Sequence, residues 1–256
     1  MSASASCTQG GEAMNEEEWI VSENLYRMVD VLGPKASSRK LRLFGSACCR
    51  RFTTHFKDAR SLQLVDVSER FADRLVDLDA VNAAFDEAAD AQEAIHWEGG
   101  DAVDQSTAES VLGLREALVL SQVFEGTMEA TASIFAAAAW ERIHNPPDRD
   151  WSETHAEHEA AEDEGRRSEL IAQVSLLRDI FGNPFRPVAV DPEWLTSTVV
   201  ALARGIYDDR AFDRLPILAD ALQDAGYENE DVLNHCRGPG PHVRGCWVVD
   251  LLLGKD

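Results

Sequence analysis

The sequence predicts an all-α protein, a multi-helix bundle of about eight to ten helices that ends in a compact C-terminal helical unit. Apolar residues recur at steps of three and four along most of the chain, which is the pattern of helices that bury one face. Capping residues, glycines and prolines separate these segments. No alternation of apolar and polar residues and no Asn-Gly turn indicates a strand.

The first helices are marked by their caps and stops. Asn15 precedes three glutamates, as expected of a helix N-terminus, and the Gly-Pro pair at 33–34 ends that element. The next helix begins at Ser37 or Ser38. The core faces of this helix and of the one after it are predicted to hold Leu41, Phe44, Cys48, Phe52 and Phe56, and then Leu64, Val67, Phe71, Leu75 and Leu78.

The C-terminal part carries clearer helix signals. Asp191 is a predicted cap with Pro192 in the first turn, the position that proline favours. Asp213 is a candidate cap for a helix that ends near Gly226. Asn229 is expected to cap a short helix, and the apolar residues 246–253 close the chain as a last helix.

The sequence is expected to divide into four regions, and its charge is unevenly spread. These are a disordered tail at residues 1–14, an N-terminal helical region at 15–143, an acidic linker leading into a helix at 144–168, and a C-terminal helical module at 169–256. Residues 61–175 carry 7 basic and 26 acidic side chains, which is most of the net charge of -22. Such a field repels phosphate, so binding to nucleic acid or to an anionic membrane surface is not expected.

The N-terminal residues and the cysteines favour a location inside the cell. Residues 1–18 lack a positively charged start and an apolar run, so no secretory signal is expected. The five cysteines are few and odd in number, which favours reduced thiols and a cytoplasmic location over a disulfide framework.

One loop near the C-terminus gathers zinc-ligand residue types. His235, Cys236, His242 and Cys246 lie within twelve residues around a Gly-Pro-Gly-Pro turn. Their spacing is unusual for zinc, because adjacent residues on a helical turn point in divergent directions. The interpretation that the sequence favours is structural: Cys246 is buried beside Trp247, and the histidines hydrogen-bond the loop. A zinc site is the alternative.

Two further groups of residues are candidate sites. Cys246 with His242 or His235 would make a nucleophilic thiol pair, but the apolar residues after Cys246 favour burial. The basic residues Arg39, Lys40, Arg42, Arg50 and Arg51 form a cluster that would contact RNA or an acidic partner. The favoured interpretation is that this cluster neutralises the acidic middle of the same chain. No Walker A, dinucleotide-binding, GxSxG or HExxH motif occurs.

Two segments resemble a known family. The segment KASSRKLRLFGSACCRRF (residues 35–52) and the long string from residue 176 to 255, which ends in HCRGPGPHVRGCWVVDLLLGK, resemble an uncharacterised protein family abundant in planctomycete bacteria. The resemblance implies a bacterial cytosolic protein of unknown activity, with no catalytic residues to carry over.

Two hypotheses of function follow from the sequence. The first is a non-catalytic helical interaction or scaffold protein, whose acidic middle section is suited to selecting a basic protein partner. It requires no cofactor. The alternative is a zinc-binding or thiol-dependent protein centred on the loop from His235 to Cys246.

Overall fold

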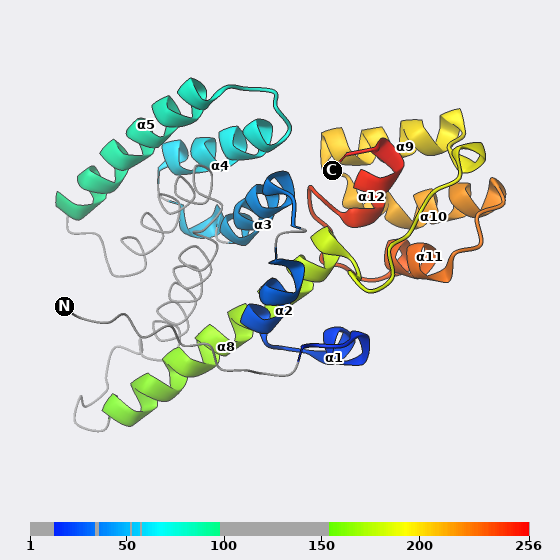
Figure 1. Cartoon of the computed structure of the whole chain (residues 1–256). Helices are drawn as coiled ribbons and strands as arrows, with labels where there is room; N and C mark the ends of the chain where they lie inside the picture. Colours follow the sequence, from blue (N-terminus) through cyan, green and yellow to red (C-terminus); the bar gives the residue numbers. More distant parts are fainter. Residues whose placement is uncertain (1–12, 34–35, 52, 57, 98–153, 256) are drawn as a thin grey trace, which may run out of the picture.

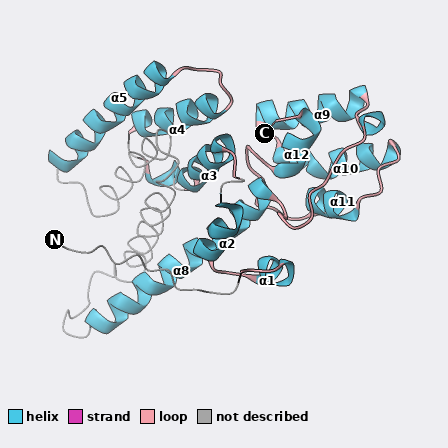
Figure 2. Ribbon diagram, viewed as in Figure 1, coloured by secondary structure: helices cyan, strands magenta, loops and turns pink. Residues whose placement is uncertain are grey.

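The computed structural model describes residues 13–33, 36–51, 53–56, 58–97 and 154–255 (Figure 1). All regular structure in these ranges is helical, and no strand occurs among them (Figure 2). The all-α prediction is therefore confirmed, and the described ranges hold ten α-helices. Among these helices none is both long enough and apolar enough to cross a membrane.

Six helices form the N-terminal part of the fold. They are α1 (Glu16–Val21), α2 (Leu25–Leu32), α3 (Ser38–Arg50), α4 (Ala59–Ala72), α5 (Leu78–Trp97) and α8 (Thr154–Phe181), with a 3-10 turn at Thr53–His55. Helices α3 and α5 pack on α4, while α2 and α3 pack on α8 (Figure 1). The predicted boundary between residues 168 and 169 falls inside α8. Beyond that boundary, Val174, Leu177 and Ile180 of α8 share a core with the N-terminal helices.

Four helices form the C-terminal module. They are α9 (Ser197–Asp209), α10 (Leu215–Asp224), α11 (Glu230–Arg237) and α12 (Trp247–Leu253), with 3-10 turns at Pro192–Trp194 and Phe212–Arg214. Helix α10 packs between α9 and α11, and α12 packs on α9 (Figure 1). Their apolar faces meet in one core that includes Ala203, Leu218 and Val249. This packing places the last helix beside the first helix of the module.

The caps explain where most of these helices begin. Asn15 and Glu18 form the two reciprocal hydrogen bonds of a capping box at the start of α1. Asn229 caps α11 as predicted. The prediction of a single helix before Gly33 is wrong, because Asn24 caps a second helix and divides the segment in two. Asp191 caps only a 3-10 turn, and α9 begins after a different cap, Thr196.

The predicted core faces of α3 and α4 are only partly correct. Phe44 and Cys48 are buried as expected, and Cys49 is fully buried as well. Leu75 is 65% exposed, because α4 ends at Ala72 and the chain turns away from the core. The buried face of α4 instead includes a glutamate, Glu69. A buried carboxylate needs partners, and these come from other helices.

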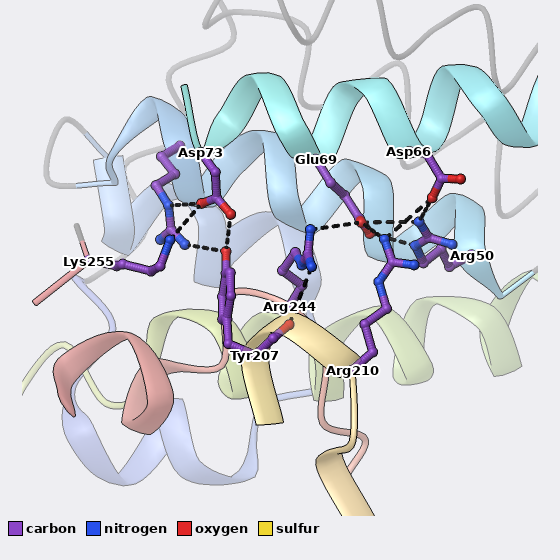
Figure 3. Close-up of polar contacts among 9 residues, drawn as sticks. Arg50, Asp66, Glu69, Asp73, Tyr207, Arg210, Arg244 and Lys255 are labelled. Atoms are coloured by element: carbon purple, nitrogen blue, oxygen red, sulfur yellow. Dashed lines mark hydrogen bonds and ion pairs between the residues drawn. The ribbon is translucent and has the colours of Figure 1, made fainter. Parts of the chain in front are cut away.

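A network of charged residues joins α4 to the C-terminal module (Figure 3). Its first part surrounds Glu69, whose carboxylate pairs with Arg50 of α3 and with Arg210 after α9. Arg244, in the loop before α12, lies 3.8 Å from the same carboxylate. Arg50 and Arg210 also pair with Asp66. Three cations thus converge on one buried carboxylate of α4.

The second part of the network surrounds Asp73, Tyr207 and Asp250. Arg39 donates to Asp73 at 2.9 Å and to both oxygens of Asp250 at 2.7 and 3.1 Å. The Tyr207 hydroxyl accepts from Arg39 at 2.7 Å and donates to Asp73 at 2.6 Å. Lys255 lies 3.4 Å from Asp73 (Figure 3). Arg39 therefore ties α3 to both α4 and α12.

Glu169, inside α8, gives the protein a pH dependence that can be measured. Its side chain is fully buried and accepts hydrogen bonds from Arg51 at 3.0 Å and Gln173 at 3.1 Å. Burial raises the pKa of Glu169 from its ordinary 4.5 to about 7, although Arg51 and Gln173 act in the opposite direction. The folded chain therefore holds a proton between these values that the unfolded chain releases. The contribution of Glu169 to stability falls as pH rises through this range.

Replacing Glu169 with glutamine is expected to remove this dependence. The variant should match the wild type near pH 5 and should be more stable by about 2 to 3 kcal/mol near pH 8, since each pKa unit corresponds to about 1.4 kcal/mol. Urea unfolding of both proteins at several pH values measures the difference. If the free energies of unfolding of the two proteins change with pH in parallel, the Glu169 carboxyl group ionises with its ordinary pKa and the prediction is wrong.

Candidate metal centre

Four side chains with metal-ligand atoms meet where α8 contacts the C-terminal module. Asp179 lies near the end of α8, His235 lies on α11, His242 lies in the loop that follows, and Cys246 immediately precedes α12. One ligand atom from each of them lies within 4.8 Å of the others. Three of the four residues proposed from the sequence are thus brought together, and Asp179 joins them.

Two glycines allow the loop to return to α8. Gly240 has φ +84°, and a Cβ atom on it would lie 2.9 Å from the backbone nitrogen of His242. Gly245 has φ +96°, and its Cβ would lie 3.0 Å from Leu43 of α3. Both positions therefore require glycine. The cis bond between Gly240 and Pro241 lies in the same turn.

Asp179 is the centre of the cluster. One carboxylate oxygen, Oδ1, lies 2.7 Å from His242 Nδ1 and 3.2 Å from His235 Nε2. The other oxygen, Oδ2, accepts a hydrogen bond from the backbone N–H of Val243 at 2.9 Å. Burial alone would raise the pKa of the Asp179 carboxyl, but its hydrogen bonds to the two histidines and the charge of His242 lower it. The group is therefore held as a carboxylate.

His242 is oriented by partners on both ring nitrogens. Its Nδ1 faces Asp179, and its Nε2 lies 3.3 Å from the carbonyl oxygen of Gly238. Burial disfavours the charged ring, but the hydrogen bond and charge of Asp179 outweigh it and raise the pKa of His242. Because a carboxylate and a carbonyl only accept, both nitrogens donate in this arrangement.

His235 has a different set of partners. Its Nδ1 accepts a hydrogen bond from the indole N–H of Trp247 at 3.1 Å. Its Nε2 faces the cluster, 3.2 Å from Cys246 Sγ. Since indole can only donate, Nδ1 carries no proton, and the neutral ring carries its proton on Nε2. The Trp247 hydrogen bond thus fixes which nitrogen of His235 is protonated.

The two cysteines of this region are both buried in the core of the C-terminal module, but only Cys246 belongs to the cluster. Cys246 is fully buried, and burial raises its pKa well above the ordinary value. Cys236 is also fully buried, with a pKa raised by burial to about 12, and it packs in the core of the C-terminal module outside the cluster. Neither cysteine is the exposed, low-pKa thiol that a nucleophilic cysteine needs. The thiol-dependent alternative stays a prediction.

The geometry of the helix explains why Cys236 is not a member of the cluster. Consecutive residues on a helix point about 100° apart, so when His235 faces α8, Cys236 faces the module's own core. The fourth member of the cluster is Asp179, which comes from a distant part of the sequence. The only local signal for it is an acidic residue inside the apolar run LLRDIF of α8, where a carboxylate is buried only if it has partners.

Two pockets have His235 in their walls. The first, of about 250 Å³, is lined by Asp179, His235, His242 and the Gly-Pro-Gly-Pro turn. The second, of about 300 Å³, is lined by His235, Trp247, Trp19 and residues of the loop after α8. His235 therefore forms part of the wall of both pockets. Its Nε2 faces Cys246, whereas its Nδ1 faces Trp247.

The basic cluster proposed from the sequence makes contacts within the chain. Arg39 and Arg50 belong to the network described above, and Arg51 pairs with Glu169 at 3.0 Å. Lys40 donates to the carbonyl oxygen of Ile180 at 2.8 Å. Arg42 lies over the ring of Phe71 at 4.9 Å. Binding of this cluster to an external partner stays a prediction.

Comparison with known proteins adds no identity to this site: no protein-family model, curated protein or solved structure matches the chain. The resemblance to a planctomycete family stays a prediction as well.

Proposed function

We propose that this protein is a non-catalytic helical protein that binds one zinc ion through Asp179, His235, His242 and Cys246. The observation that carries the proposal is the convergence of these four ligand atoms to within 4.8 Å of one another from three separate parts of the chain. The ion would hold the loop after α11 and the start of α12 against α8. Its role would be to fix the C-terminal module on the N-terminal helices.

The spacing of the ligand atoms supports the proposal. Zinc binds nitrogen, oxygen and sulfur at about 2.0 to 2.3 Å, which places tetrahedral donors about 3.3 to 3.8 Å apart. Three pairs in the cluster lie at 2.7, 3.2 and 3.2 Å, and all lie within 4.8 Å. Movements of about 1 Å would therefore convert the hydrogen-bonded cluster into a tetrahedral site.

The identity of the ligands favours zinc over the common hard cations. Calcium and magnesium bind almost entirely through oxygen, whereas this set offers two imidazoles, one thiol and one carboxylate. Four protein ligands fill a tetrahedral site, which is the usual arrangement of structural zinc rather than catalytic zinc. The outer partners of two ligands also fit, since Gly238 orients His242 and Val243 orients Asp179.

A pair of cysteine variants tests the proposal. We expect the wild type to bind about one zinc ion per chain. Cys246→Ala should lower the affinity at least about 100-fold, because losing a direct ligand should exceed the 10- to 100-fold effect of outer partners. Cys236→Ala is the matched control, since Cys236 is an equally buried thiol outside the cluster, and its affinity should stay within about twofold of the wild type.

The measurement is competition for zinc against a chromophoric chelator, with metal content determined on the purified proteins. Absence of zinc binding by the wild type, or equal losses in the two variants, would contradict the proposal. Circular dichroism of each variant checks that it has kept its helices.

A further inference from the structure

We propose that Trp247 controls the metal affinity of the cluster, because its hydrogen bond to His235 exists only in the metal-free protein. This inference rests on the proposed function. The indole N–H of Trp247 donates to His235 Nδ1 at 3.1 Å, and this contact places the ring proton on Nε2, the atom that faces Asp179 and Cys246. A metal ion needs the lone pair of that same nitrogen.

The Trp247–His235 hydrogen bond and a zinc ion on His235 Nε2 cannot exist together, because they require the ring proton on different nitrogens. When zinc binds Nε2, the proton on that atom leaves to solvent, and the ring stays neutral only if Nδ1 takes up a proton. Nδ1–H and the indole N–H of Trp247 would then be two donors facing each other across 3.1 Å. The hydrogen bond must break, and the indole keeps its own proton throughout.

His235 differs in this respect from the other ligands. The N–H of His242 that faces away from the cluster has an acceptor, the carbonyl oxygen of Gly238, which suits a metal-bound imidazole. Asp179 receives the backbone N–H of Val243 on its second oxygen and keeps Oδ1 for a metal. Only the outer partner of His235 is a donor where a metal-bound imidazole needs an acceptor.

The surroundings of Trp247 allow it to respond. The indole packs on Gly182, where a Cβ atom would lie 3.1 Å from its ring. It also lines the second pocket, of about 300 Å³, together with His235 and Trp19. This volume has room for water molecules that accept from Nδ1–H and from the released indole N–H. Metal binding at the cluster is thereby coupled to the wall of the second pocket.

The expected effect on affinity follows from the lost hydrogen bond. Trp247→Phe removes the indole donor and keeps an aromatic ring, so His235 can protonate Nδ1 without breaking a contact. A hydrogen bond with a net value of about 1 kcal/mol corresponds to about fivefold in affinity, so this variant should bind zinc about fivefold more tightly than the wild type. Trp194→Phe is the matched control, because Trp194 packs on Tyr227 away from the cluster and its replacement should leave the zinc affinity unchanged.

The direct test uses ¹⁵N-labelled full-length protein. The indole N–H signal of Trp247 is assigned by its absence from the Trp247→Phe spectrum, and the His235 nitrogens are followed in two-bond correlation spectra. Addition of one equivalent of zinc should move the Trp247 indole proton upfield and convert Nδ1 of His235 from unprotonated to protonated. The indole signal of Trp194 should stay in place.

The outcomes separate the two proposals. If zinc binds but the Trp247 signal and the His235 tautomer stay unchanged, or if Trp247→Phe binds zinc no more tightly than the wild type, the inference about Trp247 is overturned and the proposed function stands. If neither the wild type nor any variant binds zinc, the proposed function is overturned, and the inference falls with it.

Discussion

Replacing Arg39 with methionine is expected to lower the free energy of unfolding by about 3 to 5 kcal/mol. The guanidinium of Arg39 donates to Asp73, to both oxygens of Asp250 and to the Tyr207 hydroxyl. The side chains of the two aspartates are only 2% and 1% exposed. Removing Arg39 leaves these carboxylates buried with much of their compensating charge gone, and the loss falls on contacts between α3, α4 and α12.

An exposed ion pair provides the control for this prediction. Arg27 lies 3.6 Å from Glu18, with the two side chains 49% and 46% exposed, so Arg27→Met should change stability by less than about 1 kcal/mol. Adding Asp250→Asn to Arg39→Met removes one uncompensated charge, and the double variant should be more stable than the single one. Chemical denaturation measures all three. Equal effects of the Arg27 and Arg39 replacements would show that the network contributes no more than a surface pair.

Replacing Asp179 with asparagine is expected to lower the zinc affinity at least about 100-fold, beyond the range seen for outer partners. The substitution keeps the shape of the side chain and an oxygen that accepts from the Val243 N–H, but it removes the negative charge that faces both histidines. Of the four ligand residues, Asp179 alone is already deprotonated before a metal binds, since burial raises the pKa of the Cys246 thiol. The same chelator competition measures the effect.

A surface aspartate tests whether the loss is specific. Asp220 lies on α10 with a side chain 71% exposed and pairs with Arg237. Asp220→Asn changes the net charge by the same amount, so any effect of the general field on a cation appears in both variants. Affinity lost equally in both would assign the effect to net charge and would contradict direct coordination by Asp179.

Local signals predicted much of the fold. The caps Asn15 and Asn229 act within three residues of their own position, so their patterns identify helix starts directly. The sequence does not reveal the break between α1 and α2, because only a short polar segment separates two apolar stretches, and Asn24 acts as a cap within it. The sequence does not reveal the buried face of α4, because Glu69 is buried only through arginines from elsewhere in the chain, Arg50 and Arg210.

The candidate site also depends on contacts between helices that the sequence does not reveal. His235, His242 and Cys246 are close in sequence and were recognised by residue type, whereas Asp179 lies on a different helix and reaches them only through tertiary packing. Cys236 matches by residue type because it adjoins His235 in the sequence, but the helix turns it toward the core of the C-terminal module. The role of Trp247 depends on one hydrogen bond to His235, and no sequence pattern specifies which ring nitrogen accepts it.

The most direct test of the metal centre is anomalous diffraction at the zinc absorption edge from crystals of zinc-loaded protein. We expect one strong peak between α8 and the loop after α11, about 2.0 to 2.3 Å from an oxygen of Asp179, a nitrogen of each of His235 and His242, and the sulfur of Cys246. A zinc-loaded crystal in which these four side chains keep their direct hydrogen bonds, with the anomalous signal elsewhere or absent, would contradict the account.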